Sequence, residues 1–159
     1  MKITVIAVGR LKNGPERDLL ERYVDRAARA GRQLGLTFDL RELAESAARS
    51  ASVRKDEEAA AIRAAVPAGA PLVALDERGR ALDSRGFAER IATWRDQGTG
   101  NLAIAIGGAD GLGKAVLAAA DLRLAFGALT WPHQLVRILL AEQLYRTVTI
   151  LSGHPYHRD

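Results

Sequence analysis

Short apolar runs alternate with longer amphipathic segments along the whole chain, and this alternation restricts the folds that it can form. KITVIAV at 2–8 is rich in β-branched residues and has the length of one buried strand. The segment 15–30 carries apolar residues at helical spacing, with Pro15 near its start. The same pattern predicts strands at 36–43, 71–76, 101–108 and 122–126, and helices at 50–66, 84–98, 114–121 and 132–151.

Strands separated by helices are joined most simply as a largely parallel sheet with helices on both faces, so we predict the α/β class. The chain has 159 residues and no recognisable linker, which indicates a single domain spanning 1–159. Within it, the polar stretch 76–84 is predicted to be a loop, with Ser84 capping the helix that follows. The segment 44–54 is predicted to be a mobile loop entering a helix.

The composition argues against several classes of site. The sequence has no cysteine, so disulfides and thiolate metal ligands are impossible. Its three histidines are scattered, with His133 far from His154 and His157, and we therefore expect no zinc site. No apolar run approaches the ~20 residues that span a bilayer, and the N-terminal MKITVIAV lacks a signal-peptide cleavage pattern. These features predict a cytoplasmic protein.

Basic residues are in slight excess. The formal net charge is +4, from 23 basic and 19 acidic residues, which suits a polyanionic partner without requiring one. Most of the basic residues are arginines, which grip phosphates in two places, although genome composition produces the same bias. Arg22, Arg26 and Arg29 follow helical spacing, and a solvated helix face explains them better than a stripe of phosphate contacts.

A glycine-rich loop, GGADGLGKA at 107–115, is the most conspicuous motif. From Gly108 onward it has the glycine and lysine spacing of a P-loop, but Ala115 stands where a Ser or Thr would bind Mg²⁺. A dinucleotide fold is disfavoured too, because its glycines should follow the first strand, where only Gly9 and Gly14 occur. Four glycines within seven residues at the end of a buried strand favour a bound ligand over a simple turn.

Two further loops are predicted at the same edge of the sheet, where ligands of parallel sheets bind beyond the carboxyl ends of the strands. One follows Leu75, and the other is FGALTWPH at 126–133. The second loop is apolar where loops are normally polar, and its backbone groups and apolar walls suit an adenine or a thioether better than a phosphate. An equally open alternative is that Leu129 and Trp131 plug the core.

The chain ends in GHPYHRD at 153–159, which holds two of its three histidines. Together with IGGADGL and ALTWPHQLVRILLAEQLYR, this tail resembles the ribosomal RNA large subunit methyltransferase H family of the SPOUT superfamily. The resemblance covers essentially the whole chain. It implies a parallel α/β sheet whose C-terminal segment is threaded into a trefoil knot, although knots are among the rarest topologies.

The resemblance also implies an activity. Such enzymes transfer a methyl group from S-adenosylmethionine, without a metal, to N3 of a pseudouridine in the 23S ribosomal RNA of assembled ribosomes, and they act as homodimers. By position, the implied cofactor contacts are Leu75, Gly107, Phe126, Gly127, Ala128, Leu129, Thr130 and Trp131. The last helix has apolar residues on more than one face, which suits a helix shared with a partner subunit or one fully buried in the core.

The tail supplies the candidate catalytic residues. N3 of pseudouridine must lose its imino proton before it attacks a methyl group, and His157 is the hypothesised base or proton relay. Arg158 would hold a phosphate or stabilise negative charge on the target base, and Tyr156 would stack on that base or hydrogen-bond to it. His154 is predicted to shape the turn, and His133 to orient the cofactor loop. The tail would lie over the cofactor of its own chain or, across a dimer, over that of the other subunit.

Two rival functions share the same motifs. The first is a knotted methyltransferase that acts on another RNA, such as transfer RNA. The second is a ribosome-binding assembly factor without activity, against which the intact HPYHRD tail argues.

Overall fold

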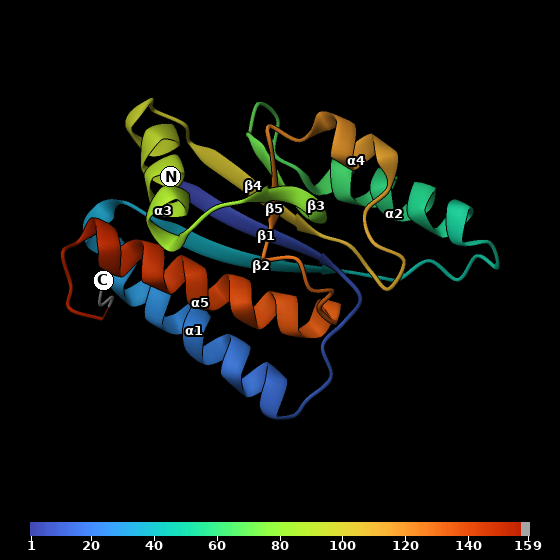
Figure 1. The fold of residues 1–159 in the computed structure, drawn as a ribbon, viewed down its shortest axis with the longest axis horizontal. Helices are drawn as coiled ribbons and strands as arrows, with labels where there is room; N and C mark the ends of the chain where they lie inside the picture. Colours follow the sequence, from blue (N-terminus) through green and yellow to red (C-terminus); the bar gives the residue numbers. More distant parts are fainter. Residues whose placement is uncertain (157–159) are drawn as a thin grey trace.

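Five parallel strands form one sheet in the order β2-β1-β4-β3-β5, in a computed structural model that describes residues 1–156 (Figure 1). Every predicted strand is present, and every neighbouring pair in the sheet runs parallel. The strands are β1 (Lys2–Val8), β2 (Thr37–Leu43), β3 (Leu72–Ala81), β4 (Asn101–Ile106) and β5 (Leu122–Ala125).

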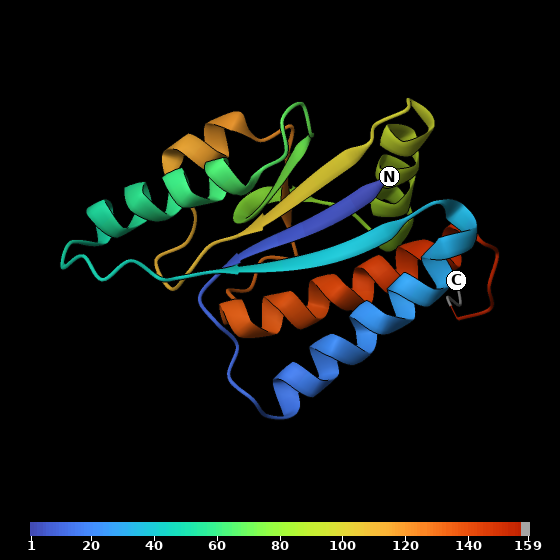
Figure 2. The same cartoon turned by 180° about the vertical axis from the view of Figure 1, so that it is seen from behind.

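Helices cover both faces of this sheet (Figures 1 and 2), so the predicted α/β class is confirmed. They are α1 (Pro15–Gly31), α2 (Ala51–Ala65), α3 (Ser84–Asp96), α4 (Lys114–Ala119) and α5 (His133–Leu151), with a short 3₁₀ turn at Arg32–Leu34. The helices α1, α3 and α5 share one face, and α2 and α4 share the other. Among residues 1–156, none of the helices combines the length and the apolar character needed to cross a bilayer.

The central strand β1 is buried on both faces because its side chains alternate between two cores. Ile3 and Ala7 pack with α3 and α5, whereas Ile6 and Val8 pack with α2 and α4. Each fully buried isoleucine stabilises the fold by roughly 1.5–3 kcal/mol. This double burial explains why the run at 2–8 is almost continuously apolar, as expected for a strand inside a parallel sheet.

The third strand is longer than predicted, and the loop prediction for 76–84 is wrong. β3 continues through Ala81, and after an irregularity it pairs again with β5 at Arg80 and Ala81. Gly79 permits this close approach, because a Cβ there would lie 2.7 Å from the carbonyl carbon of Arg123. The extension is largely exposed, and exposure removes the apolar pattern on which strand prediction depends.

The start of α3 differs from the prediction by one residue. Asp83, and not Ser84, is the N-cap, and its carboxylate accepts a 2.7 Å hydrogen bond from the backbone N–H of Gly86. Ser84 instead donates to the side chain of Gln143 on α5 at 2.8 Å. Both residue types cap helices well, so only the packing against α5 decides between them.

The predicted loop at 44–54 is shorter than expected, since α2 already covers its C-terminal part. The remaining stretch is tied to α2 by hydrogen bonds. The backbone N–H of Ser46 donates to Glu58 at 3.1 Å, and Arg54 donates to the carbonyl of Arg49 at 2.9 Å.

Candidate functional site

A cleft of about 900 Å³ opens at the carboxyl ends of β3, β4 and β5. Its walls come from residues 75–78 of β3, from the glycine loop (107–113) after β4, and from the apolar loop (126–132) between β5 and α5. These segments meet because the carboxyl ends of parallel strands lie at one edge of the sheet. The structure therefore brings together the three segments that stand out in the sequence, although the first of them belongs to β3 and is not a loop.

The glycine loop folds back on itself without room for a side chain at its first position. A Cβ on Gly107 would lie 2.6 Å from the carbonyl carbon of Gly111, closer than real Cβ contacts. Gly111 has a φ of +81°, and its N–H donates to the carbonyl of Gly108 at 3.0 Å, which closes the turn. The wall of the cleft here is consequently backbone, which lets a ligand approach N–H and C=O groups directly.

The apolar loop is exposed and does not fill the core. Leu129 is 70% exposed and Trp131 is 41% exposed, so the alternative in which they plug the core is wrong. Gly127 turns the chain with a φ of +92°. The indole N–H of Trp131 donates to the carbonyl of Phe126 at 3.1 Å and closes the loop on itself.

Charged side chains of both signs also line the cleft: Lys55, Asp76, Glu77, Arg78, Asp110 and Arg123. Thr130 of the apolar loop donates to Glu77 across the cleft at 3.2 Å. Arg54 donates to Asp110 at 2.7 Å, and this hydrogen bond holds the pKa of the Asp110 carboxyl below its usual range. Sequence reasoning missed Arg54 and Lys55, because they lie on α2 and no local pattern connects that helix with the glycine loop.

Most of the predicted cofactor residues line this cleft, namely Leu75, Gly107, Phe126, Gly127, Leu129, Thr130 and Trp131. Ala128 is exposed and lies outside the lining. His133, predicted to orient the cofactor loop, lines the cleft as the first residue of α5. In the part of the chain that the structure describes, no group of three or more His, Asp or Glu side chains suits a metal ion.

The described part of the tail, up to residue 156, packs against α5 through Tyr156. The ring of Tyr156 lies 4.6 Å from that of Tyr145, and its hydroxyl donates to Glu142 at 3.4 Å. The guanidinium of Arg146 stands over the Tyr156 ring, 5.3 Å from its centroid. Burial raises the pKa of Tyr156 to about 12, and a hydrogen bond with Tyr23 acts in the same direction.

This anchor is remote from the cleft of the same chain. Tyr156 does not line the cleft, and its partner Tyr145 is twelve helical residues, about 18 Å, beyond His133. The prediction that His154 shapes the turn is confirmed, because its Nδ1 accepts a 3.2 Å hydrogen bond from the backbone N–H of Tyr156. The candidate base His157 and its neighbour Arg158 lie outside the described residues.

Comparison with known families decides what kind of protein this is. Residues 1–157 match the family described as "Predicted SPOUT methyltransferase". The chain belongs to the SPOUT methyltransferases. Enzymes of this family take their methyl group from S-adenosylmethionine.

Relatives of this SPOUT methyltransferase that are named Ribosomal RNA large subunit methyltransferase H are similar over their whole length. One from Sinorhizobium medicae and one from Rhizobium rhizogenes are 59% and 58% identical over 159 residues, which cover 99% of each chain. One from Bradyrhizobium sp. is 57% identical and covers 99% of this chain and 98% of the relative. The family resemblance drawn from the three motifs is thereby confirmed.

A solved structure supports the fold. A probable methylase family protein from Haemophilus influenzae superposes with a TM-score of 0.51 at 16% identity. The alignment covers 99% of this SPOUT methyltransferase and 70% of the other chain.

Proposed function

We propose that this enzyme transfers the methyl group of S-adenosylmethionine to N3 of a pseudouridine in 23S ribosomal RNA, on assembled ribosomes in the cytoplasm. One observation carries the proposal. Residues 75–78 of β3 and the loops after β4 and β5 form a single cleft in a chain whose relatives are named as ribosomal RNA large subunit methyltransferases. The net charge of +4 suits an RNA partner.

The residues of the cleft fit S-adenosylmethionine. Leu75, Phe126 and Leu129 offer apolar walls for an adenine, and Gly107, which has no side chain of its own, lines the cleft with backbone. We assign these residues, with the rest of 126–131, to hold the cofactor. When bound, the cofactor supplies an electrophilic methyl group.

The protein's own part is to orient the acceptor and to remove its proton. N3 carries an imino proton at neutral pH, so we assign His157 as the base or relay and Arg158 to a phosphate or to the charge that develops on the base. The ring of Tyr156 is already packed against Tyr145. We therefore assign Tyr156 to docking the tail, and not to stacking on the target base.

The position of the tail favours action on a second copy of the chain. About 18 Å of helix lies between His133 in the cleft and Tyr145 beside the tail. Residues 157–159 add at most ~10 Å of extended chain. The tail is thus poorly placed for its own cleft.

An exposed apolar stripe supports a homodimer. Leu135 and Leu139 lie one turn apart on α5 and are exposed, and the apolar loop with the exposed Leu129 and Trp131 leads into this helix. If two α5 helices pair antiparallel about a two-fold axis, this stripe is covered and the tail of each copy comes beside the cleft of the other. The trefoil knot and the single domain over 1–159 belong to the same proposal, supported by the meeting of residues 75–78 of β3 with the loops after β4 and β5.

A mixing experiment tests the arrangement of the tail. One variant carries G107V, which displaces the glycine loop and so disrupts the cleft but keeps the tail, and the other lacks residues 154–159 but keeps the cleft. Each alone should be inactive, and the second should still bind S-adenosylmethionine by calorimetry. When the two variants are co-expressed, about half of the dimers contain one copy of each. If the tail acts across the dimer, one of the two sites in each mixed dimer is complete, so about one quarter of the wild-type activity per subunit returns. Action within one chain restores none.

A second experiment identifies the acceptor. The protein is incubated with labelled S-adenosylmethionine and, separately, with ribosomes, protein-free ribosomal RNA and transfer RNA, and labelled nucleosides are identified by mass spectrometry. Label in N3-methylpseudouridine from ribosomes is the expected result. Label in transfer RNA would support the first rival function, and ribosome binding without label would support the inactive assembly factor.

A further inference from the structure

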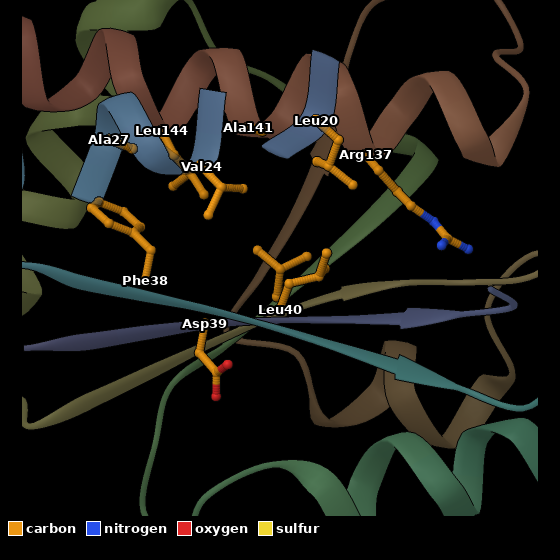
Figure 3. Close-up of a pocket in the computed structure, with 10 residues that line it drawn as sticks. Leu20, Val24, Ala27, Phe38, Asp39, Leu40, Arg137, Ala141 and Leu144 are labelled. Carbon is orange, nitrogen blue, oxygen red and sulfur yellow. The ribbon is translucent and has the colours of Figure 1, made fainter. Parts of the chain in front are cut away.

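A buried arginine ties the start of α5 to the sheet edge that carries the cleft. Arg137 is only 1% exposed. Figure 3 shows its side chain leaving α5 beside Leu20 and reaching past the layer of apolar side chains toward the carboxyl ends of the strands. There it donates to the carbonyl of Val8, the last residue of β1, at 2.6 Å, and to Glu42 of β2 at 3.0 Å.

Glu42 is the hub of this arrangement. Its carboxylate also accepts hydrogen bonds from the backbone N–H of Leu11 at 2.8 Å and from Arg17 of α1 at 2.9 Å. Arg17 in turn donates to the carbonyl of Leu11 at 2.9 Å. One carboxylate therefore joins the end of β2, the loop after β1, the first turn of α1 and the second turn of α5.

Stability alone does not explain the buried charge. Replacing a buried ion pair by apolar side chains is often neutral or stabilising, because desolvation offsets the Coulomb attraction. The Nε of Arg137 is buried and has no acceptor among residues 1–156. The walls around its stem are mostly apolar, and they enclose a cavity of about 20 Å³ between α1, β2 and α5 (Figure 3).

What the hydrogen bonds of Arg137 do provide is a fixed position for α5 on the sheet. They fix the second turn of α5 relative to β1 and β2, whereas an apolar side chain would allow the helix to slide. His133 and Val136, within the first turn of the same helix, line the cleft, and the apolar loop leads directly into them. The position of α5 therefore sets the position of this loop opposite the glycine loop.

We propose that Arg137 is a positioning residue for the cofactor cleft, which holds the apolar loop in place by anchoring α5 to Glu42 and to the end of β1. This inference rests on the proposed function of the cleft. It predicts that removing the side chain of Arg137 weakens cofactor binding more than removing that of Arg17, which binds the same Glu42 carboxylate.

Arg17 provides the matched control, because it binds the same carboxylate from α1, away from the cleft. We compare R137M, R137K and R17M by calorimetry with S-adenosylhomocysteine and by thermal unfolding. Methionine suits the apolar walls around Arg137, and R137K keeps the charge should R137M fail to fold. The expected result is about tenfold weaker binding for R137M, an intermediate loss for R137K, and a change below about twofold for R17M. Equal losses for R137M and R17M, or unchanged binding in R137M and R137K, would overturn the proposal.

A readout without ligand separates this inference from the proposed function. The sequence has two tryptophans, so a W94F background leaves Trp131 of the apolar loop as the sole indole. R137M should shift its emission relative to the background, and R17M should not. If the wild-type protein binds no S-adenosylhomocysteine, the proposed cofactor site fails, and the emission alone then decides whether Arg137 positions the loop. Identical emission in R137M and R17M overturns the positioning role.

Discussion

The guanidinium of Arg54 lies 2.7 Å from the carboxylate of Asp110 and joins α2 to the glycine loop. These residues are 56 positions apart in sequence. Arg54 also donates to the carbonyls of Ala48 and Arg49, so the stretch before α2 is connected to the same loop. The pair therefore connects the glycine loop of the cleft to α2, which packs on the face of the sheet opposite to α5.

Removing this pair should affect the cleft more than the stability of the fold. In D110N the hydrogen bond to Arg54 loses its charge, and we expect S-adenosylhomocysteine to bind about threefold more weakly. The melting temperature should change by less than about 2 °C, because solvent-accessible ion pairs contribute little to stability. E21Q, which removes an exposed ion pair with Arg17 on α1, is the control and should change neither measurement. Loss of affinity in both variants would contradict a local role for Asp110.

Gly107 should tolerate no side chain. In G107A the new Cβ would collide with the backbone of Gly111 and Leu112, so the glycine loop must shift. A shift that costs about 1.4 kcal/mol of binding energy weakens cofactor affinity about tenfold. G100A is the matched control, because no atom lies within 4 Å of a Cβ at that position. Calorimetry that finds G107A and G100A alike would refute the assigned cleft.

The hydroxyl of Tyr156 should lose its proton only at unusually high pH. Its pKa is raised to about 12 by burial, above the ordinary 10.0, so the neutral hydroxyl stabilises the docked tail. A raised pKa means that this contribution is complete below pH 10.0 and is lost as the pH rises through about 12. Ultraviolet titration of the wild type minus that of Y156F should show a phenolate component with a midpoint near 12. A component at the ordinary value would show that the tail is not docked on α5.

Glu42 should make the fold sensitive to acid. Burial raises its pKa, but hydrogen bonds from Leu11 and Arg17 outweigh burial, and the net pKa is lowered. Because the pKa of Glu42 is lower in the folded state, its ionised carboxylate stabilises the fold at pH values above the ordinary carboxyl pKa of ~4. This contribution is lost as the pH falls through the lowered pKa of the folded state. Because E42Q cannot ionise, urea unfolding should find it roughly 1–3 kcal/mol less stable at neutral pH. Its stability should also fall less steeply below pH ~5. Equal slopes in the two proteins would contradict the hub role of Glu42.

The apolar periodicity was sufficient to place every strand and helix, and it failed where exposure or backbone geometry took over. The extension of β3 to Ala81 carries polar residues and depends on Gly79, whose lack of a Cβ lets β3 approach β5. Nothing in the local pattern distinguishes such a glycine from one in a loop. The cap at Asp83 was missed because Ser84 is an equally good cap residue, and its contact with Gln143 on α5 is remote in sequence.

The sequence by itself determined the α/β class, the order of the elements and the loops that form the cleft, because these follow from local periodicity and from the rule that parallel strands end at one edge. Only the tertiary structure decided that Leu129 and Trp131 are exposed, that Arg54 contacts Asp110, that Arg137 is buried against Glu42, and that Tyr156 docks on α5. The two arginine contacts, for example, join segments that are 56 and 95 residues apart, and all four findings depend on how the elements pack. Packing of this kind is set by strand order and by the placement of the helices, which a local pattern of residues does not record.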